Sequence, residues 1–300
     1  MPRHERLPSI ARAPSRTPFA QLDASGNPVS QQFGVIQLVS DGANGNYNAG
    51  SLKVTKRFSA GLSVISSYTF AKSMDNTSGI RVQGFDTLYP QNSGCLQCER
   101  GLSSFNVKQR FVTSVLYDLP VGKGRGLNVT NPFLNAAVGG WQLGGVWTSQ
   151  TGLPQVISIG GVDRSNTGVG YDRPIATGSN PYIGNPTPSR WYDPAAYVEA
   201  PAGTWGNVGR NTLVGPGIRA FDLAAHKEFP MPFKEGHLLK FRLEAFNVLN
   251  HPSWSNPNGN ILAGAAFPGQ PSTNPHQGFG VISGTAVQMR QIQVALKYTF

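Results

Sequence analysis

Charged residues are scarce in this chain of 300 residues. Asp, Glu, Lys and Arg make up 13% of it, whereas soluble domains contain about 25%. Acidic residues are the scarcer kind, with 15 against 25 basic residues, so the formal net charge is +10. No basic run is longer than the pair Lys56-Arg57. We therefore expect no nucleic-acid partner, and assign the positive charge to a barrel lumen or to a surface that faces anionic lipid.

Long apolar runs are also missing. No stretch approaches the roughly 18–20 apolar residues that a membrane-spanning helix needs. Residues 1–23 contain four arginines among prolines and lack the apolar core of a signal peptide. These absences leave two interpretations, a soluble protein or the rear part of a longer exported one.

Motifs of catalysis and metal binding are absent as well. The five histidines show neither HxH nor HxxxH spacing, and no GxSxG motif occurs. The two cysteines, Cys95 and Cys98, form one CxxC without a second pair or a nearby histidine, which does not by itself indicate a metal. We expect a loop disulfide there, or no role. We also expect no catalytic, cofactor or metal site, and no enzymatic activity.

The chain does contain alternating apolar and polar residues. Near the C-terminus, Ile292, Val294, Leu296, Tyr298 and Phe300 alternate with polar or small side chains, and a period of two over ten residues is typical of a β-strand. Similar alternation predicts eight strands near residues 33–39, 51–58, 61–72, 107–119, 139–151, 218–229, 238–250 and 286–300. Asn247 interrupts the apolar parity of its strand, which predicts a bulge or a strand end.

Connection lengths differ between the two ends of these strands. Residues 74–106, 152–217 and 251–285 form long connections, whereas residues 59–60, 120–137 and 230–236 form shorter turns. The Gly- and Asn-rich turn predicted over residues 42–48 is the one exception, a short connection at the end where the others are long. The GKGRG sequence within 120–137 lacks the strand and helix of a phosphate-binding loop, so we interpret it as part of a connecting turn. Transmembrane barrels combine long extracellular loops with short periplasmic turns.

Aromatic residues support the same interpretation. Large apolar side chains gather where strands meet the short turns, namely Phe58, Tyr117, Leu119, Phe229, Tyr298 and Phe300. Such a girdle is expected at the edge of a bilayer. Lys56 and Lys227 lie on apolar faces two residues before an aromatic, so they should sit at the interface, where a charge costs little.

Polar faces of two adjacent strands contain several titratable residues, Asp222, His226, Lys240, Arg242 and Glu244. Two interpretations are open: carboxylates of a site, or ion pairs that face a lumen. We favour ion pairs.

Short segments in the same order along the chain resemble a known family. They include Gly61–Lys72, Arg110–Gly122 (RFVTSVLYDLPVG), Gly206–Gly217 (GNVGRNTLVGPG), Phe241–Pro252 (FRLEAFNVLNHP) and the terminal Tyr-Thr-Phe. Together they resemble the C-terminal barrel of TonB-dependent outer-membrane receptors, in the Oar-like group that has a carboxypeptidase-regulatory-like domain at its N-terminus. The resemblance implies a barrel of about 22 strands and energised uptake of a large solute.

The predicted fold is therefore all-β. Residues 1–32 form an irregular segment, and residues 33–300 form an antiparallel meander of about eight strands, a sector of a transmembrane barrel in the bacterial outer membrane. The resemblance also implies that the TonB system acts through a plug domain that this sequence lacks, so we expect a fragment or truncated gene product that does not transport alone. Expected partners are outer-membrane lipid and the outer-membrane assembly machinery, which the resemblance suggests would recognise Tyr298 and Phe300.

Two alternatives stay open at this stage. One is a secreted, soluble β-sandwich whose loops bind a ligand, since eight alternating strands suit a sandwich. The other is a small passive outer-membrane barrel complete in itself. Burial of Val294, Leu296, Leu243 and Tyr68 between two stacked sheets would favour the sandwich.

Overall fold

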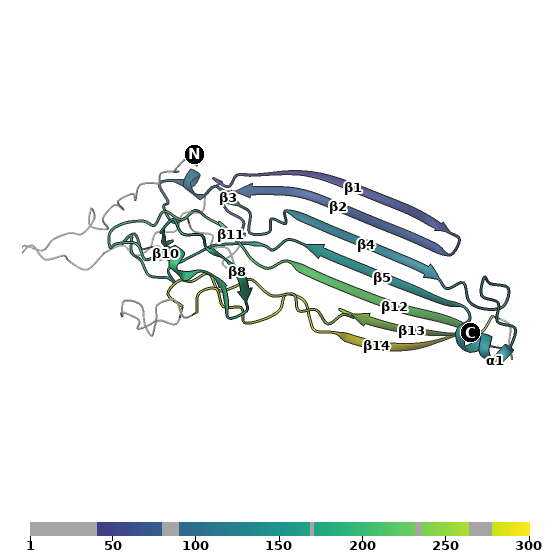
Figure 1. The fold of residues 1–300 in the computed structure, drawn as a ribbon. Coiled ribbons are helices and arrows are strands. Elements are labelled where there is room, and N and C mark those ends of the chain that lie inside the picture. The colour runs from purple at the N-terminus through teal and green to yellow at the C-terminus, as the bar shows by residue number, and fades with distance from the viewer. Residues whose placement is uncertain (1–40, 80–89, 169–170, 232–235, 264–277) are drawn as a thin grey trace, which may run out of the picture.

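The computed structural model describes residues 41–79, 90–168, 171–231, 236–263 and 278–300. Its main element is an antiparallel sheet whose long strands follow one another as a meander (Figure 1). These strands are β1 (Gly45–Ser59), β2 (Leu62–Asp75), β4 (Gln109–Asp118), β5 (Trp141–Gln150), β12 (Ile218–Pro230), β13 (Leu238–Phe246) and β14 (Gln291–Thr299). An eighth, two-residue strand, β3 (Gly101–Leu102), pairs with the end of β2. The predicted all-β meander of about eight strands is confirmed.

Strand boundaries differ from the prediction by four residues or more in three places. The Gly- and Asn-rich residues 45–48 belong to β1, because they pair with residues 72–75 of β2; the predicted turn over 42–48 is wrong there. β14 begins at Gln291 instead of residue 286. β13 ends at Phe246, because Asn247 has a φ of 46° and leaves the extended conformation. The predicted strand near 33–39 lies outside the described residues.

Side chains of one kind share each face of the sheet. The register aligns one apolar row across six strands, namely Val294, Leu243, Ala225, Leu143, Tyr117 and Leu62. An adjacent row on the other face consists of Arg242, His226, Gln142 and Asp118. We call these the apolar face and the polar face. Because a shift of one residue would exchange the faces, the alternation in sequence fixes the pairing.

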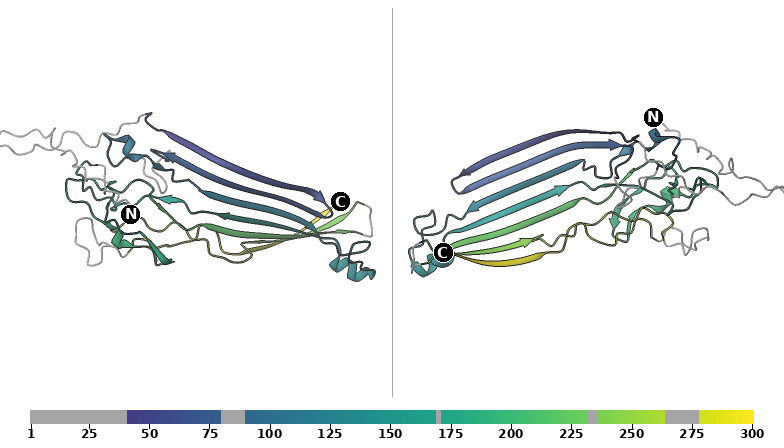
Figure 2. Two further views of the ribbon diagram at one scale, coloured as in Figure 1. Left: turned by 45° about the horizontal axis from the view of Figure 1, so that its top comes forward. Right: turned by 180° about the vertical axis from the view of Figure 1, so that it is seen from behind.

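The sheet is a single twisted layer (Figure 2). Val294 and Leu296 on its apolar face are 61% and 66% exposed, and Leu243 and Tyr68 are exposed as well. A sandwich would bury these side chains between two sheets. The soluble β-sandwich alternative is therefore wrong.

A hydrophobic core lies among the long connections instead of against the sheet. Its buried members are Ile157, Ile159, Tyr192, Ala196, Tyr197, Val208, Leu213, Ile261 and Phe279. Short strand pairs surround them, β6 (Pro154–Gln155) with β11 (Leu213–Val214), β7 (Ile175–Ala176) with β10 (Tyr197–Val198), and β8 (Tyr182–Thr187) with β9 (Arg190–Tyr192). We call the described parts of residues 74–106, 152–217 and 247–290 the loop assembly. It occupies one end of the sheet (Figure 1).

Two short 3-10 helices lie in the loop assembly. One, Pro194–Ala196, begins after Asp193, whose side chain accepts a hydrogen bond from the backbone N of Ala195. The sequence predicts a helical piece at this place, around residues 193–198. The other, Leu96–Glu99, has no counterpart in the prediction.

The opposite end of the sheet has tighter connections. Ser59 pairs with Leu62, so the β1–β2 turn is formed by Ala60 and Gly61, with φ of 51° and 76°. Positive φ at both central residues defines a type I′ turn, which suits the twist of a hairpin. Gly61 adopts this conformation freely, whereas Ala60 does so at some cost. The predicted turn over residues 59–60 is thus displaced by one residue.

A helix also lies at this end, where the sequence predicts a turn. Helix α1 (Pro132–Val138) begins after Asn131, whose Oδ1 accepts hydrogen bonds from the backbone N of Phe133 and Leu134. Pro132 occupies the first helical position, where its missing N–H costs nothing. The Asn-Pro pair is a helix-start signal that the sequence analysis did not use.

Candidate functional site

The polar face holds pairs of charged and polar groups that bridge adjacent strands. Lys240 Nζ lies 2.6 Å from Glu228 Oε1, and Gln142 Nε2 donates to Asp118 Oδ1 at 2.6 Å. Glu244 accepts hydrogen bonds from Arg242 and from Gln293 on the next strand. These contacts agree with the interpretation of the face as ion pairs facing a lumen.

Asp222 does not join these pairs. Its Oδ1 accepts a hydrogen bond from the backbone N of Asn247 at 2.8 Å. Asn247 is buried, and its own amide donates to the carbonyls of His251 and Gln288. The two residues therefore fasten the end of β13 to the loop assembly, and Asn247 marks a strand end instead of a bulge.

Both predicted interfacial lysines contact backbone carbonyls near the short turns. Lys56 Nζ donates to the carbonyls of Ser59 and Leu62, each at 3.0 Å. Lys227 Nζ donates to the carbonyls of Ala136 and Ala137 at the end of α1. Because these carbonyls satisfy the ammonium groups, each lysine can occupy the apolar face at this depth.

Aromatic rings surround the C-terminus at the same end. The centroids of Tyr298 and Phe300 lie 6.2 Å apart, and His237 lies 5.5 Å from Tyr298 with a hydrogen bond between the two side chains. Phe300 is 90% exposed. The side chains predicted to be recognised during assembly are thus accessible, and their role stays a prediction.

Arg210 is the central buried cation of the loop assembly. Its guanidinium contacts the Asp75 carboxylate and donates to the carbonyl of Asp75 at 2.6 Å. It also donates to the carbonyl of Glu99 at 2.9 Å and to Ser78 Oγ at 3.1 Å. One side chain from residues 206–217 therefore joins the end of β2 to the 90–106 segment.

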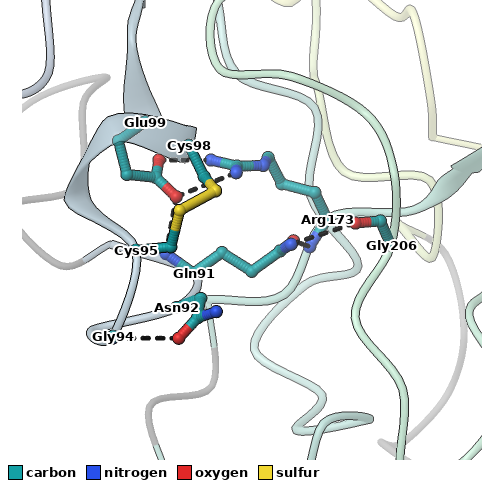
Figure 3. Close-up of a disulfide and its surroundings, with 8 residues drawn as sticks. All are labelled: Gln91, Asn92, Gly94, Cys95, Cys98, Glu99, Arg173 and Gly206. Carbon is teal, nitrogen blue, oxygen red and sulfur yellow. Dashed lines mark hydrogen bonds and ion pairs between the residues drawn. A yellow bond between two sulfur atoms is a disulfide. The ribbon is translucent and has the colours of Figure 1, made fainter. Parts of the chain in front are cut away.

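Glu99 provides the second buried ion pair (Figure 3). Its carboxylate receives both terminal nitrogens of Arg173, at 2.5 Å and 2.9 Å, and the backbone N of Gln91 at 3.0 Å. Gln91 in turn accepts from the backbone N of Arg173 and donates to the carbonyl of Gly206. Three segments distant in sequence thus meet around Gln91 and Glu99.

A disulfide joins Cys95 and Cys98 beside this ion pair, with an S–S distance of 2.03 Å. Cys95 directly precedes the 3-10 helix Leu96–Glu99, and Cys98 lies within it, next to Glu99 (Figure 3). Closing so short a loop limits the conformations from which Glu99 must be ordered. The structure thus contains the loop disulfide that was one of the two interpretations of the CxxC.

Glycines permit the close packing of these segments. A Cβ on Gly206 would lie 1.9 Å from the carbonyl oxygen of Arg173, and one on Gly101 would lie 2.5 Å from that of Arg210. Backbone cannot yield to such contacts, so a side chain at either position would separate the segments. This is the physical reason for glycine at the start of the GNVGRN sequence.

Asp172 is a buried carboxylate of the loop assembly whose charge is poorly stabilised. Its Oδ2 accepts from the backbone N of Ser165 at 2.6 Å, but its Oδ1 has no hydrogen-bond partner among the described residues. Burial raises the pKa of Asp172, and the nearby Asp163 raises it further.

This raised pKa predicts a pH-dependent stability. A carboxyl whose folded pKa exceeds its unfolded value, about 3.9, stabilises the fold below that value and loses the contribution as pH rises toward the folded pKa. Asp172→Asn removes this titration. The unfolding temperature of the variant minus that of wild type should therefore increase from about pH 3.5 to neutrality. The protease resistance of the loop assembly during heating measures the unfolding temperature. Asp41→Asn, at an exposed position, is the control. A difference independent of pH would contradict the prediction.

No helix in the described parts of the chain has the length and apolar character needed to cross a membrane. The profile of a family described as "Outer membrane beta barrel domain" matches residues 5–293. No curated protein and no solved structure matches the chain. The match includes every long strand in full except β14, of which it includes residues 291–293.

Proposed function

Since the chain belongs to the outer membrane beta barrel domain family, we propose that its sheet is one sector of the barrel of a TonB-dependent receptor that takes up a large solute. The family places the protein in the bacterial outer membrane. Its apolar face then contacts lipid, and its polar face lines the lumen. The loop assembly lies at the extracellular end, and the short turns and α1 at the periplasmic end.

The observation that most supports a larger barrel is the pair of open sheet edges. Among the described strands, β1 pairs only with β2 along its length, and β14 pairs only with β13. All residues of both edge strands are exposed. An unpaired edge is unfavourable in a bilayer, because no water satisfies its backbone groups. We infer that further strands flank both edges in the assembled barrel.

The polar face also favours a wide barrel. Small barrels fill their interior with side chains, whereas barrels of about 22 strands enclose a plugged lumen. Here Lys53 and Glu228 lie on the polar face and are exposed. Solute contacts are proposed for the loop assembly, and coupling to the TonB system through a plug domain. Assembly would use Tyr298 and Phe300, and no catalytic role is proposed.

Uptake measurements test this proposal. Labelled ferric chelates, cobalamin and oligosaccharides are offered to bacteria that have the gene for the whole receptor that contains this sheet, lack that gene, or lack TonB. At least one solute should accumulate only when both the gene and TonB are present. Accumulation that needs the gene but persists without TonB would instead identify a passive barrel. Absence of any solute that requires both would contradict the proposal.

A further inference from the structure

Helix α1 is held against the apolar side of the sheet, at its periplasmic end. Trp141 and Lys227 are paired neighbours on the apolar face, in the row that also contains Phe241. Trp141 Nε1 donates to the carbonyl of Ala137 at 2.9 Å, and Lys227 Nζ donates to the carbonyls of Ala136 and Ala137. Both donor side chains project from the lipid-facing side of the sheet. The end of α1 is therefore anchored on that side.

The segment around α1, residues 120–140, is itself well ordered. We call it the α1 turn. Asn135 Oδ1 accepts from the backbone N of Lys123 at 2.8 Å, and Asn128 Oδ1 accepts from that of Gly124 at 3.0 Å. Val121 and Leu127 form a parallel bridge. These bonds fix the GKGRG sequence against the helix, so its charges and the helix form one surface.

Apolar side chains of the α1 turn are uncovered by the described residues. Phe133 is 88% exposed, Leu127 63% and Leu134 53%. Exposed apolar side chains in one short segment are unfavourable in water. The segment that contains them is bound to Trp141 and Lys227 of the apolar face, so it lies next to the membrane.

Charge in the α1 turn has one sign. Residues 119–141 contain Lys123 and Arg125 and no Asp or Glu. Both cations are exposed, and neither forms an ion pair with a described residue. Cations beside exposed aromatic and aliphatic side chains are typical of segments that lie in the interface of an anionic membrane.

We propose that the α1 turn is an interfacial anchor that binds anionic phospholipid in the periplasmic leaflet. Phe133 and Leu134 enter the boundary between headgroups and acyl chains, while Lys123 and Arg125 contact lipid phosphates. The anchor fixes the depth of the sheet at its periplasmic end. This inference depends on the location in the outer membrane and not on solute transport, so the uptake measurements and the tests below fail independently.

Thiol accessibility tests the insertion of Phe133. Phe133→Cys and Ala60→Cys are made in the full chain and treated, in outer membranes from cells that produce it, with a charged maleimide. Both native cysteines are in a disulfide, so they do not react. Ala60 is exposed at the tip of the β1–β2 turn and already has positive φ, which makes it a matched control at the same end. We expect Phe133→Cys to react at least roughly tenfold more slowly than Ala60→Cys, because lipid shields the thiol. Equal rates would overturn the proposal.

Lipid retention tests the cations without altering the apolar residues. The double variant Lys123→Gln/Arg125→Gln is extracted in mild detergent, and the retained phosphatidylglycerol and phosphatidylethanolamine are quantified. The control, Lys53→Gln/Lys297→Gln, removes the same charge from exposed positions on the polar face, in β1 and β14. Each interfacial cation strengthens anionic-lipid binding by about fivefold, so the first variant should lose most of its phosphatidylglycerol and the control should retain it. Equal retention in both variants, or equal loss, would overturn the proposal.

Discussion

Replacement of Arg210 by methionine is expected to unfold the loop assembly while leaving the sheet inserted. The methionine keeps the apolar stem but leaves the Asp75 carboxylate without its buried cation, and it removes donors to the carbonyls of Asp75 and Glu99. Removing one partner of a buried ion pair costs about 3–5 kcal/mol. Since Glu99 also holds Arg173, the loss should spread to the 171–174 segment.

Limited proteolysis of outer membranes measures this effect, because the loop assembly should be cleaved rapidly in the variant and slowly in wild type. Arg190→Met is the matched control. Arg190 belongs to the same assembly, but its side chain is 62% exposed and its contact with Asp193 is 3.4 Å long. A surface change of this kind should alter stability by less than about 0.5 kcal/mol. Equal resistance of Arg210→Met and wild type would show that the buried pair is dispensable.

Arginine in place of Val294 is expected to impair membrane insertion. Val294 lies on the apolar face near the middle of β14, with Leu243 as its cross-strand neighbour. A basic side chain facing lipid at the bilayer midplane costs about 2–4 kcal/mol. The variant should accumulate less in the outer membrane and unfold at a lower urea concentration in lipid vesicles.

Gln293→Arg provides the control, since it places the same charge one residue away on the polar face. There the guanidinium can contact Glu244, which already accepts a hydrogen bond from Gln293. Insertion and urea resistance should match wild type. Should the two variants behave alike, the assignment of the apolar face to lipid would be contradicted.

Much of the sheet was predictable because its physics is local. Apolar and polar residues that alternate with a period of two specify a strand, and the requirement that one face be apolar selects the pairing register. Composition gave a wrong prediction where strand pairing decided the structure. Residues 45–48 contain Gly and Asn, which predicts a turn, but they extend β1 because they pair with residues 72–75 of β2. At Ala60 the turn moved by one residue, since the pairing of Ser59 with Leu62 decides which residues turn.

The loop assembly was not predictable for the opposite reason. Arg210 and Asp75 are 135 residues apart, and Glu99 and Arg173 are 74 apart, so no local pattern joins them. Residues 206–217 were identified only through a family resemblance, and Arg210 had no assigned partner. Helix α1 was different, because its Asn-Pro start at residues 131–132 is a local signal that the sequence contains.

Because the hydrophobic core lies apart from the sheet, two parts of the molecule are stabilised against different solvents, the loop assembly against water and the apolar face against lipid. Ile157, Tyr192 and Phe279 leave water when the loop assembly folds, so that folding should show the heat-capacity change of an ordinary globular domain. Apolar side chains of the sheet exchange one apolar environment for another, so they contribute little to the heat-capacity change. Warming or cooling would thus loosen the outer half of the protein along a curved stability profile, while the strands in the bilayer stay in place.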